Sequence, residues 1–70
     1  MLIDVRTTEE YKRGHLAGSV NIPLDELKSF NLTDKSKPIR VYCKSGARSA
    51  RAKALLNTMG YTDVTDLGGI

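Results

Sequence analysis

The chain has 70 residues, 40% of them apolar and 27% charged, a composition that excludes a disordered chain and allows one small core. No apolar run approaches the ~18 residues that cross a membrane, so no membrane-spanning helix is expected. Eleven Lys and Arg residues against eight Asp and Glu residues give a net charge of +3, which suits small anions as well as nucleic acid. We therefore expect residues 1–70 to form one folded domain.

The first predicted elements are a strand over residues 2–5 and a short helix over residues 8–13. Thr7, with Glu10 three residues later, forms a capping box, a pattern typical of a helix N-terminus. Gly14 follows the last helical residue and is expected to end the helix in the left-handed conformation.

A second strand and a weak short helix are predicted next. Residues 19–22 form a strand-like run that Pro23 stops, because proline lacks the N–H group that a central strand needs. Leu24, Leu27 and Phe30 then lie at helical spacing, which predicts the short helix.

The second half of the chain contains the clearest helix signal, between two strands. Residues 39–42 predict the third strand and residues 64–67 the last one. Between them, residues 48–59 predict a helix that ends at Gly60. Its apolar residues follow the i, i+3, i+4, i+7 pattern of one helical face: Ala52, Leu55, Leu56 and Met59. Strands that alternate with helices predict an α/β fold, with a mainly parallel central sheet and helices on both faces.

Cys43 is the single cysteine, and it stands between the third strand and the helix that follows. One cysteine and one histidine exclude an internal disulfide and a structural zinc site. Open α/β sheets bind ligands at this point, where backbone N–H groups lack partners and Gly46 can adopt a positive φ. Such donors and nearby cations lower the pKa of a cysteine from about 8.5 toward about 3.5–7.5. We therefore expect Cys43 to be a reactive thiolate, and the alternative is a buried apolar residue.

Arg48 gives a second indication of an anion site at this loop. A cation in the first turn of a helix opposes the helix dipole and forgoes about 0.3–1 kcal/mol that an acidic residue would gain. Unfavourable placements of this kind tend to mark functional sites, so we expect Arg48 to hold an anion. Arg51 and Lys53 are interpreted as solvated surface cations.

Three blocks of the sequence, in this order, resemble those of the rhodanese family. They are Asp4-Val5-Arg6 followed by Glu10-Tyr11, the run from Gly14-His15-Leu16 to Asn21-Ile22-Pro23, and the loop Cys43-Lys44-Ser45-Gly46-Ala47-Arg48-Ser49. They cover nearly the whole chain. Among the subtypes, the chain is most similar to the short single-domain sulfurtransferases of the phage-shock type, and the resemblance implies a rhodanese-like fold.

The resemblance also implies the activity of a thiosulfate sulfurtransferase. The Cys43 thiolate would attack the outer sulfur of thiosulfate, sulfite would leave, and the persulfide would pass its sulfur to cyanide or a thiol. Lys44 and Arg48 would steer and hold the small anionic donor. The backbone amides that cradle the persulfide belong to the loop residues Lys44, Ser45, Gly46, Ala47 and Arg48. We expect a monomer with no cofactor, no metal and no nucleic-acid or membrane partner.

Three other polar residues are expected to be structural. His15 could act as a general base, but an acidic thiol needs none, and the corresponding histidine of the family is structural. Asp4 and Arg6 end the first strand at the sheet edge that also holds Cys43. We interpret them first as a scaffold ion pair and second as pocket residues.

Other functions remain as alternatives. Phosphatases and arsenate reductases share the fold with a loop one residue longer, whereas four residues separate Cys43 from Arg48, which favours sulfur over phosphate. A non-catalytic interaction module is the second alternative, since a fold alone does not prove activity, but such modules usually lack the cysteine. A nucleic-acid binder would interleave aromatic and basic residues, and the chain has only three Tyr and one Phe.

The end of the chain departs from the family pattern. Family domains normally continue with a helix after the Gly68-Gly69 turn. One sheet face near Leu67 and Ile70 is therefore expected to be open, in a domain clipped from a longer protein or of marginal stability. The acidic residue Asp4 lies too close to the N-terminus for the apolar stretch of a signal peptide to precede it. We expect a cytoplasmic location, or a periplasmic one if a signal peptide has been removed.

Overall fold

The computed structural model describes all 70 residues, which form four strands and three helices. In chain order they are β1 (Leu2–Asp4), α1 (Thr8–Arg13), β2 (Val20–Asn21), the 3₁₀ helix η1 (Leu24–Ser29), β3 (Ile39–Cys43), α2 (Ala47–Thr58) and β4 (Val64–Gly69). Every predicted element is present in the predicted order, although β2 is shorter than expected and β4 is longer. None of the helices has the length and apolarity that crossing a membrane requires.

The four strands form one parallel sheet in the order β2-β1-β3-β4. Ile3 of β1 pairs with Val41 of β3, and Ile39 of β3 pairs with Val64 of β4. Because all strands run in the same direction, their carboxyl ends meet at one edge of the sheet. The predicted parallel α/β class is thus confirmed, and the end of β1 lies beside Cys43 at the end of β3.

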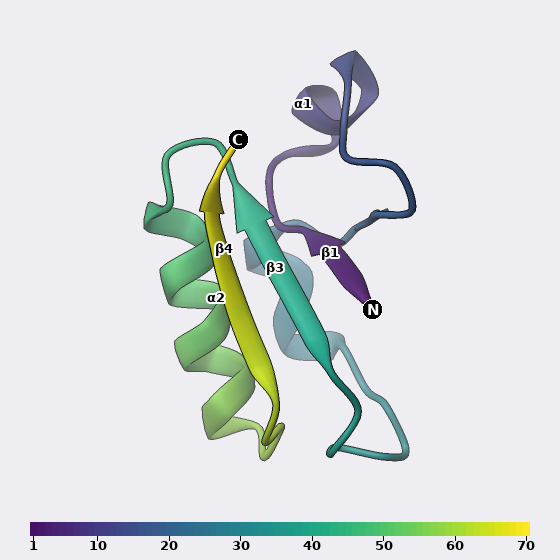
Figure 1. The fold of residues 1–70 in the computed structure, drawn as a ribbon, viewed down its shortest axis with the longest axis vertical. Coiled ribbons are helices and arrows are strands. Elements are labelled where there is room, and N and C mark those ends of the chain that lie inside the picture. Colours follow the sequence, from purple (N-terminus) through teal and green to yellow (C-terminus); the bar gives the residue numbers. More distant parts are fainter.

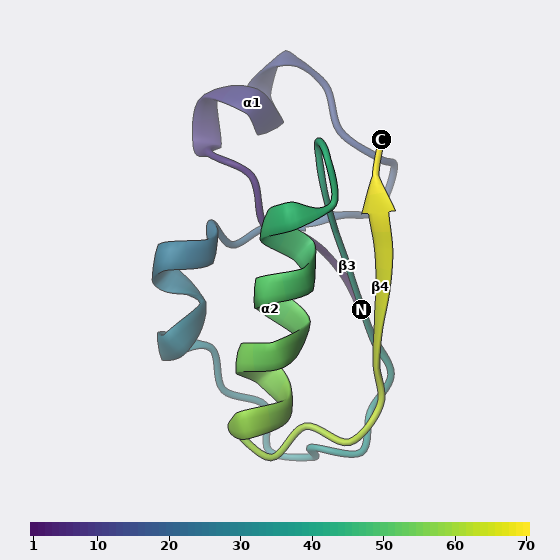
Figure 2. The same ribbon diagram turned by 90° about the vertical axis from the view of Figure 1, so that its left-hand side faces the viewer.

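Helices cover only one face of this sheet (Figure 1, Figure 2). α2 and η1 pack on that face, and α1 lies beyond the carboxyl ends of the strands, so the prediction of helices on both faces is not met by these residues. Ile39 and Val41 of β3 are buried on the helix side, whereas Arg40, which points to the opposite face, is exposed. Leu67 is 44% and Ile70 is 55% exposed, in agreement with the open face expected near them.

The core lies between the sheet and the helices α2 and η1. Ala52 and Leu56 of α2 are fully buried, and Leu55 and Met59 pack against the core at its margin. They form the helical face that the spacing of the apolar residues predicts. The other buried side chains of this cluster come from the strands, η1 and the segments that follow β1 and α2: Ile3, Val5, Leu27, Ile39, Val41, Cys43, Tyr61 and Val64.

The first helix begins as predicted and ends differently. Thr7 Oγ1 accepts the N–H of Glu10, and the Glu10 carboxylate accepts the N–H of Thr7, which completes the capping box. Gly14 is not in the left-handed conformation expected for it but has φ 150° and ψ 142°. In this conformation the Gly14 carbonyl faces Arg6 and accepts a hydrogen bond from its Nη2 at 2.7 Å.

Candidate active site

A tight loop joins Cys43, at the end of β3, to the start of α2. Gly46 directly precedes the helix and has φ 95° and ψ −16°, the positive φ that the sequence predicts for this glycine. This turn points the Gly46 N–H back at the cysteine, where it donates to Sγ at 2.9 Å. The glycine conformation therefore aims a backbone donor at the sulfur.

Ser49, in the first turn of α2, is a second group at the sulfur. Its Oγ lies 3.4 Å from Cys43 Sγ and donates to the Gly46 carbonyl at 3.1 Å. Both Cys43 and Ser49 are fully buried. The serine hydroxyl can turn from that carbonyl to donate to a thiolate. This role was not predicted, and the available signal was a small polar residue placed one turn after the cysteine loop.

The pKa of the Cys43 thiol lies below its ordinary value. Burial raises this pKa, but hydrogen bonds from the Ser49 hydroxyl and from backbone N–H groups of the loop and first helical turn outweigh burial and lower it. These donors stabilise the thiolate relative to the thiol. The surroundings thus favour the form of cysteine that acts as a nucleophile.

β4 supports the loop through direct backbone contact. The N–H of Ile70 donates to the Cys43 carbonyl at 3.0 Å. A Cβ atom at Gly69 would lie 2.2 Å from the carbonyl oxygen of Lys44, closer than real side chains approach. The absence of a side chain at Gly69 therefore permits the close packing of β4 on the loop.

Arg48 has a partner that the sequence did not indicate. Its Nη1 donates to Glu10 Oε1 at 2.6 Å and its Nη2 to Glu10 Oε2 at 3.0 Å, a two-point ion pair between α2 and α1. The hydrogen bond from Arg48, with a further one from the Thr7 N–H, lowers the pKa of Glu10 to about 2. The guanidinium group that was expected to hold an anion is thus bound to a carboxylate of the chain. The capping box already accounts for the presence of Glu10 in α1. Only the opposite charges of Glu10 and Arg48 could therefore have suggested this ion pair.

Asp4 and Arg6 form an ion pair beside the loop, as expected for a scaffold. Arg6 Nη2 lies 2.6 Å from Asp4 Oδ2, and the Tyr42 hydroxyl donates to the same oxygen at 2.8 Å. Burial raises the pKa of Asp4, but hydrogen bonds from Arg6 and Tyr42 outweigh burial and lower it. The Tyr42 hydroxyl also accepts the N–H of Leu16 at 3.1 Å. This network fixes the carboxyl ends of β1 and β3 on which the loop is built.

His15 is exposed and bonds to Tyr11 in α1. The two rings stack with their centroids 3.7 Å apart, and His15 Nδ1 lies 2.8 Å from the Tyr11 carbonyl oxygen. None of these contacts involves Cys43, in agreement with the structural interpretation of His15. No three His, Cys, Asp or Glu side chains lie close enough together to hold a metal ion.

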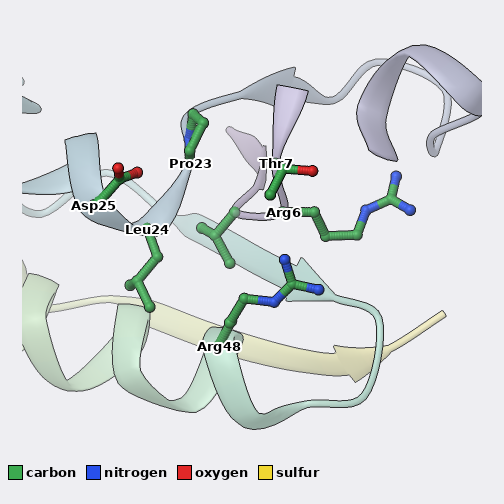
Figure 3. Close-up of a pocket in the computed structure, with 7 residues that line it drawn as sticks. Arg6, Thr7, Pro23, Leu24, Asp25 and Arg48 are labelled. Carbon is green, nitrogen blue, oxygen red and sulfur yellow. The ribbon is translucent and has the colours of Figure 1, made fainter. Parts of the chain in front are cut away.

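Two hollows adjoin the loop and share Arg6 in their walls. The larger, which we term the apolar hollow, has a volume of about 420 Å³ and is lined by Arg48 together with Val5, Pro23 and Leu24 (Figure 3). The smaller, which we term the cationic hollow, has a volume of about 320 Å³. Its charged walls are Arg6, Glu10, Arg13 and Lys44. Among the site residues predicted from the sequence, Lys44 and Arg48 line these hollows, whereas Cys43 is fully buried and lines neither.

Comparison with known proteins defines the class of this chain. The model of the rhodanese-like domain family matches residues 1–70. The thiosulfate sulfurtransferase PspE of Escherichia coli K12 is 45% identical over 97% of the chain, and the uncharacterized protein YqhL of Bacillus subtilis 168 is 42% identical over 97% of the chain. The chain spans 68% of the length of the first relative and 55% of the second.

Solved structures give the same result. A rhodanese with anions from E. coli matches with a TM-score of 0.89 and 44% identity, over 97% of this chain and 84% of that one. The human single-domain sulfurtransferase TSTD1 matches with a TM-score of 0.88 and 28% identity, over 97% of this chain and 74% of that one. The chain therefore belongs to the rhodanese family, and its resemblance to the short phage-shock-type sulfurtransferases is confirmed.

Proposed function

We propose that the chain is a thiosulfate sulfurtransferase that carries sulfur as a persulfide on Cys43. The proposal depends on the 2.9 Å hydrogen bond from the Gly46 N–H to the sulfur, within a loop whose donors lower the pKa of that thiol. Membership of the rhodanese family and 45% identity to a thiosulfate sulfurtransferase support it.

Each turnover has two steps. The Cys43 thiolate attacks the outer sulfur of thiosulfate, so that a new S–S bond forms, the S–S bond of thiosulfate breaks, and sulfite leaves with its electron pair. Cyanide or a thiolate then attacks the outer sulfur of the persulfide, which releases thiocyanate or a new persulfide and restores the Cys43 thiolate. Neither step needs an external oxidant, and an ionised thiol needs no general base.

The loop stabilises the charge on sulfur in both steps. We assign this role to backbone N–H groups of residues 44–48, which are fixed before the reaction by Gly46 and by the contact of Gly69 with the loop. Losing one such donor in comparable sites raises the barrier by about 2.7–4 kcal/mol. Lys44, which is exposed and takes part in no ion pair, draws in the anionic donor.

The proposed enzyme is a monomer that acts on a small anionic sulfur donor and on a cyanide or thiol acceptor. It works without a cofactor, in the cytoplasm or, if it is exported, in the periplasm. Size-exclusion chromatography with light scattering tests the monomer, and a mass corresponding to a dimer would contradict it.

Turnover of thiosulfate with cyanide tests the proposed function. We expect thiocyanate from the unaltered chain, parallel double-reciprocal plots for the two substrates, and no thiocyanate from Cys43→Ala. An aryl phosphate serves as the comparison substrate because related folds cleave phosphate esters. Hydrolysis of the aryl phosphate without thiocyanate formation would contradict the proposal.

A further inference from the structure

The Glu10–Arg48 ion pair joins the walls of the two hollows beside the loop. Arg48 lines the apolar hollow, and Glu10 lines the cationic hollow together with Arg13 and Lys44. Figure 3 shows the Arg48 side chain rising from the start of α2 into the apolar hollow. Glu10 therefore places a carboxylate at the boundary between the two hollows.

Glu10 is held as a fixed negative charge. Its Oε1 accepts hydrogen bonds from the N–H and the hydroxyl of Thr7, both at 3.1 Å, and from Arg48 at 2.6 Å. The capping box itself works with glutamine as well as glutamate. The charge of Glu10 is therefore available for a second purpose, which is to act on Arg48 and on anions in the cationic hollow.

Arg48, one member of this pair, interacts electrostatically with Cys43. The pKa of Arg48 is raised first by its hydrogen bond to Glu10 and further by the negative charge of Cys43, although burial opposes the rise. In the cationic hollow, Lys44 and Arg13 take part in no ion pair. An anion that enters this hollow beside Lys44 meets two free cations and one fixed carboxylate.

We propose that Glu10 is a specificity-determining residue that reduces the electrostatic advantage of doubly charged sulfur donors over singly charged ones at Cys43. This inference rests on the proposed function. Glu10 neutralises part of the positive charge of Arg48 and repels anions. The approach of a donor with two negative charges is therefore weakened more than that of a donor with one. At an effective dielectric between those of protein and water, this repulsion lowers the rate of reaction with Cys43 about five-fold for each unit of negative charge on the ligand.

Alkylation of Cys43 tests the charge effect without requiring turnover. Iodoacetate and iodoacetamide share a leaving group and differ by one negative charge, and the chain has a single cysteine to react. The ratio of their rates, measured by intact mass, cancels any change in thiolate content. We expect Glu10→Gln to raise the iodoacetate-to-iodoacetamide ratio about five-fold and Arg48→Gln to lower it by a similar factor.

The two variants separate an electrostatic role from a purely structural one. Both break the same ion pair, so a structural tether predicts that both change the ratio in the same direction or leave it unchanged, and either result would overturn the inference. Glu9→Gln is the matched control, because Glu9 is a neighbouring exposed acid of α1 that forms no ion pair. It should leave the ratio unchanged.

Steady-state kinetics extend the test to sulfur donors. Glu10→Gln should raise kcat/KM for doubly charged thiosulfate about five-fold more than for singly charged benzenethiosulfonate. Equal changes for the two donors would overturn the inference while sulfur transfer stands. If Cys43 takes sulfur from neither donor, the proposed function fails, and the alkylation ratio still decides whether Glu10 selects by charge.

Discussion

A hydrogen bond joins Gly46 to Cys43, and it depends on the backbone conformation of the glycine. The N–H of Gly46 lies 2.9 Å from Sγ because φ is 95°, a value that other residues adopt at a cost of about 1–2 kcal/mol. Space is not the constraint, since a Cβ atom at Gly46 would come no closer than 3.8 Å to its neighbours, with Gly69 N the nearest. The conformational freedom of one glycine therefore holds a donor on the sulfur.

Gly46→Ala should relax the loop and withdraw this donor. We expect kcat/KM for thiosulfate to fall about 100–1000-fold, the loss typical of one fixed donor, and the pKa of Cys43 to rise. Gly18→Ala is the control, because Gly18 also has a positive φ, 81°, with no atom within 4 Å of the added Cβ. If both variants kept unaltered kinetics, the donor would have no catalytic role.

Ser49→Ala removes the buried hydroxyl that lies 3.4 Å from the sulfur. Because a hydrogen bond to a charged group is worth about 1.5–3 kcal/mol, kcat/KM should fall about 10–100-fold. The pKa of Cys43 should rise, as measured by the pH dependence of iodoacetamide labelling. Thr58→Ala removes a hydroxyl from the far end of the same helix and should leave both quantities unchanged. An unshifted labelling profile in Ser49→Ala would argue against the contact.

Gly69→Ala should disturb the Cys43 loop, although β4, the strand that contains Gly69, bears no catalytic side chain. The added Cβ would lie 2.2 Å from the Lys44 carbonyl oxygen, so either the loop or β4 must move. We expect a loss of about 1–3 kcal/mol in the free energy of unfolding, together with a lower rate of sulfur transfer. Thr65→Ala, at an exposed position of the same strand, is the control for the unfolding measurement. Unaltered activity in Gly69→Ala would show that the loop does not depend on this close packing.

Acid should destabilise the chain through two carboxyl groups. The hydrogen bond from Arg48 lowers the pKa of Glu10 from 4.5 to about 2, and the pKa of Asp4 is also lowered, since hydrogen bonds from Arg6 and Tyr42 outweigh the opposing effect of burial. Both groups bind protons more weakly when folded. The stability they contribute is therefore complete above pH 4.5 and is lost as the pH falls toward 2. Urea unfolding across this range should show a smaller loss for Glu10→Gln, and equal losses would contradict the assignment.

The fold was largely predictable because each element carries a local signature. Thr7 marks the start of α1 by its capping box, and the spacing of Ala52 and Leu56 marks the buried face of α2. The conformation of Gly14 was predicted wrongly because a distant side chain, Arg6, bonds to its carbonyl. Helices were predicted on both faces of the sheet but cover only one, since alternating strands and helices indicate a parallel sheet without fixing the side on which each helix packs.

The parts of the site that lie close together in the sequence were predictable, whereas the parts that depend on tertiary contacts were not. Cys43 and Gly46 lie in one short loop between a strand and a helix, so their relationship could be inferred from chain order. The partner of Arg48 could not, because Glu10 lies on another helix and already has a local explanation. The approach of Gly69 to the loop likewise depends on how β4 packs beside β3.

Intact mass after incubation with thiosulfate tests most directly whether Cys43 carries sulfur. We predict that the unaltered chain gains the mass of one sulfur atom, loses it again when cyanide is added, and that Cys43→Ala gains nothing. A chain that gains no sulfur, or a Cys43→Ala variant that gains as much, would contradict a persulfide on Cys43.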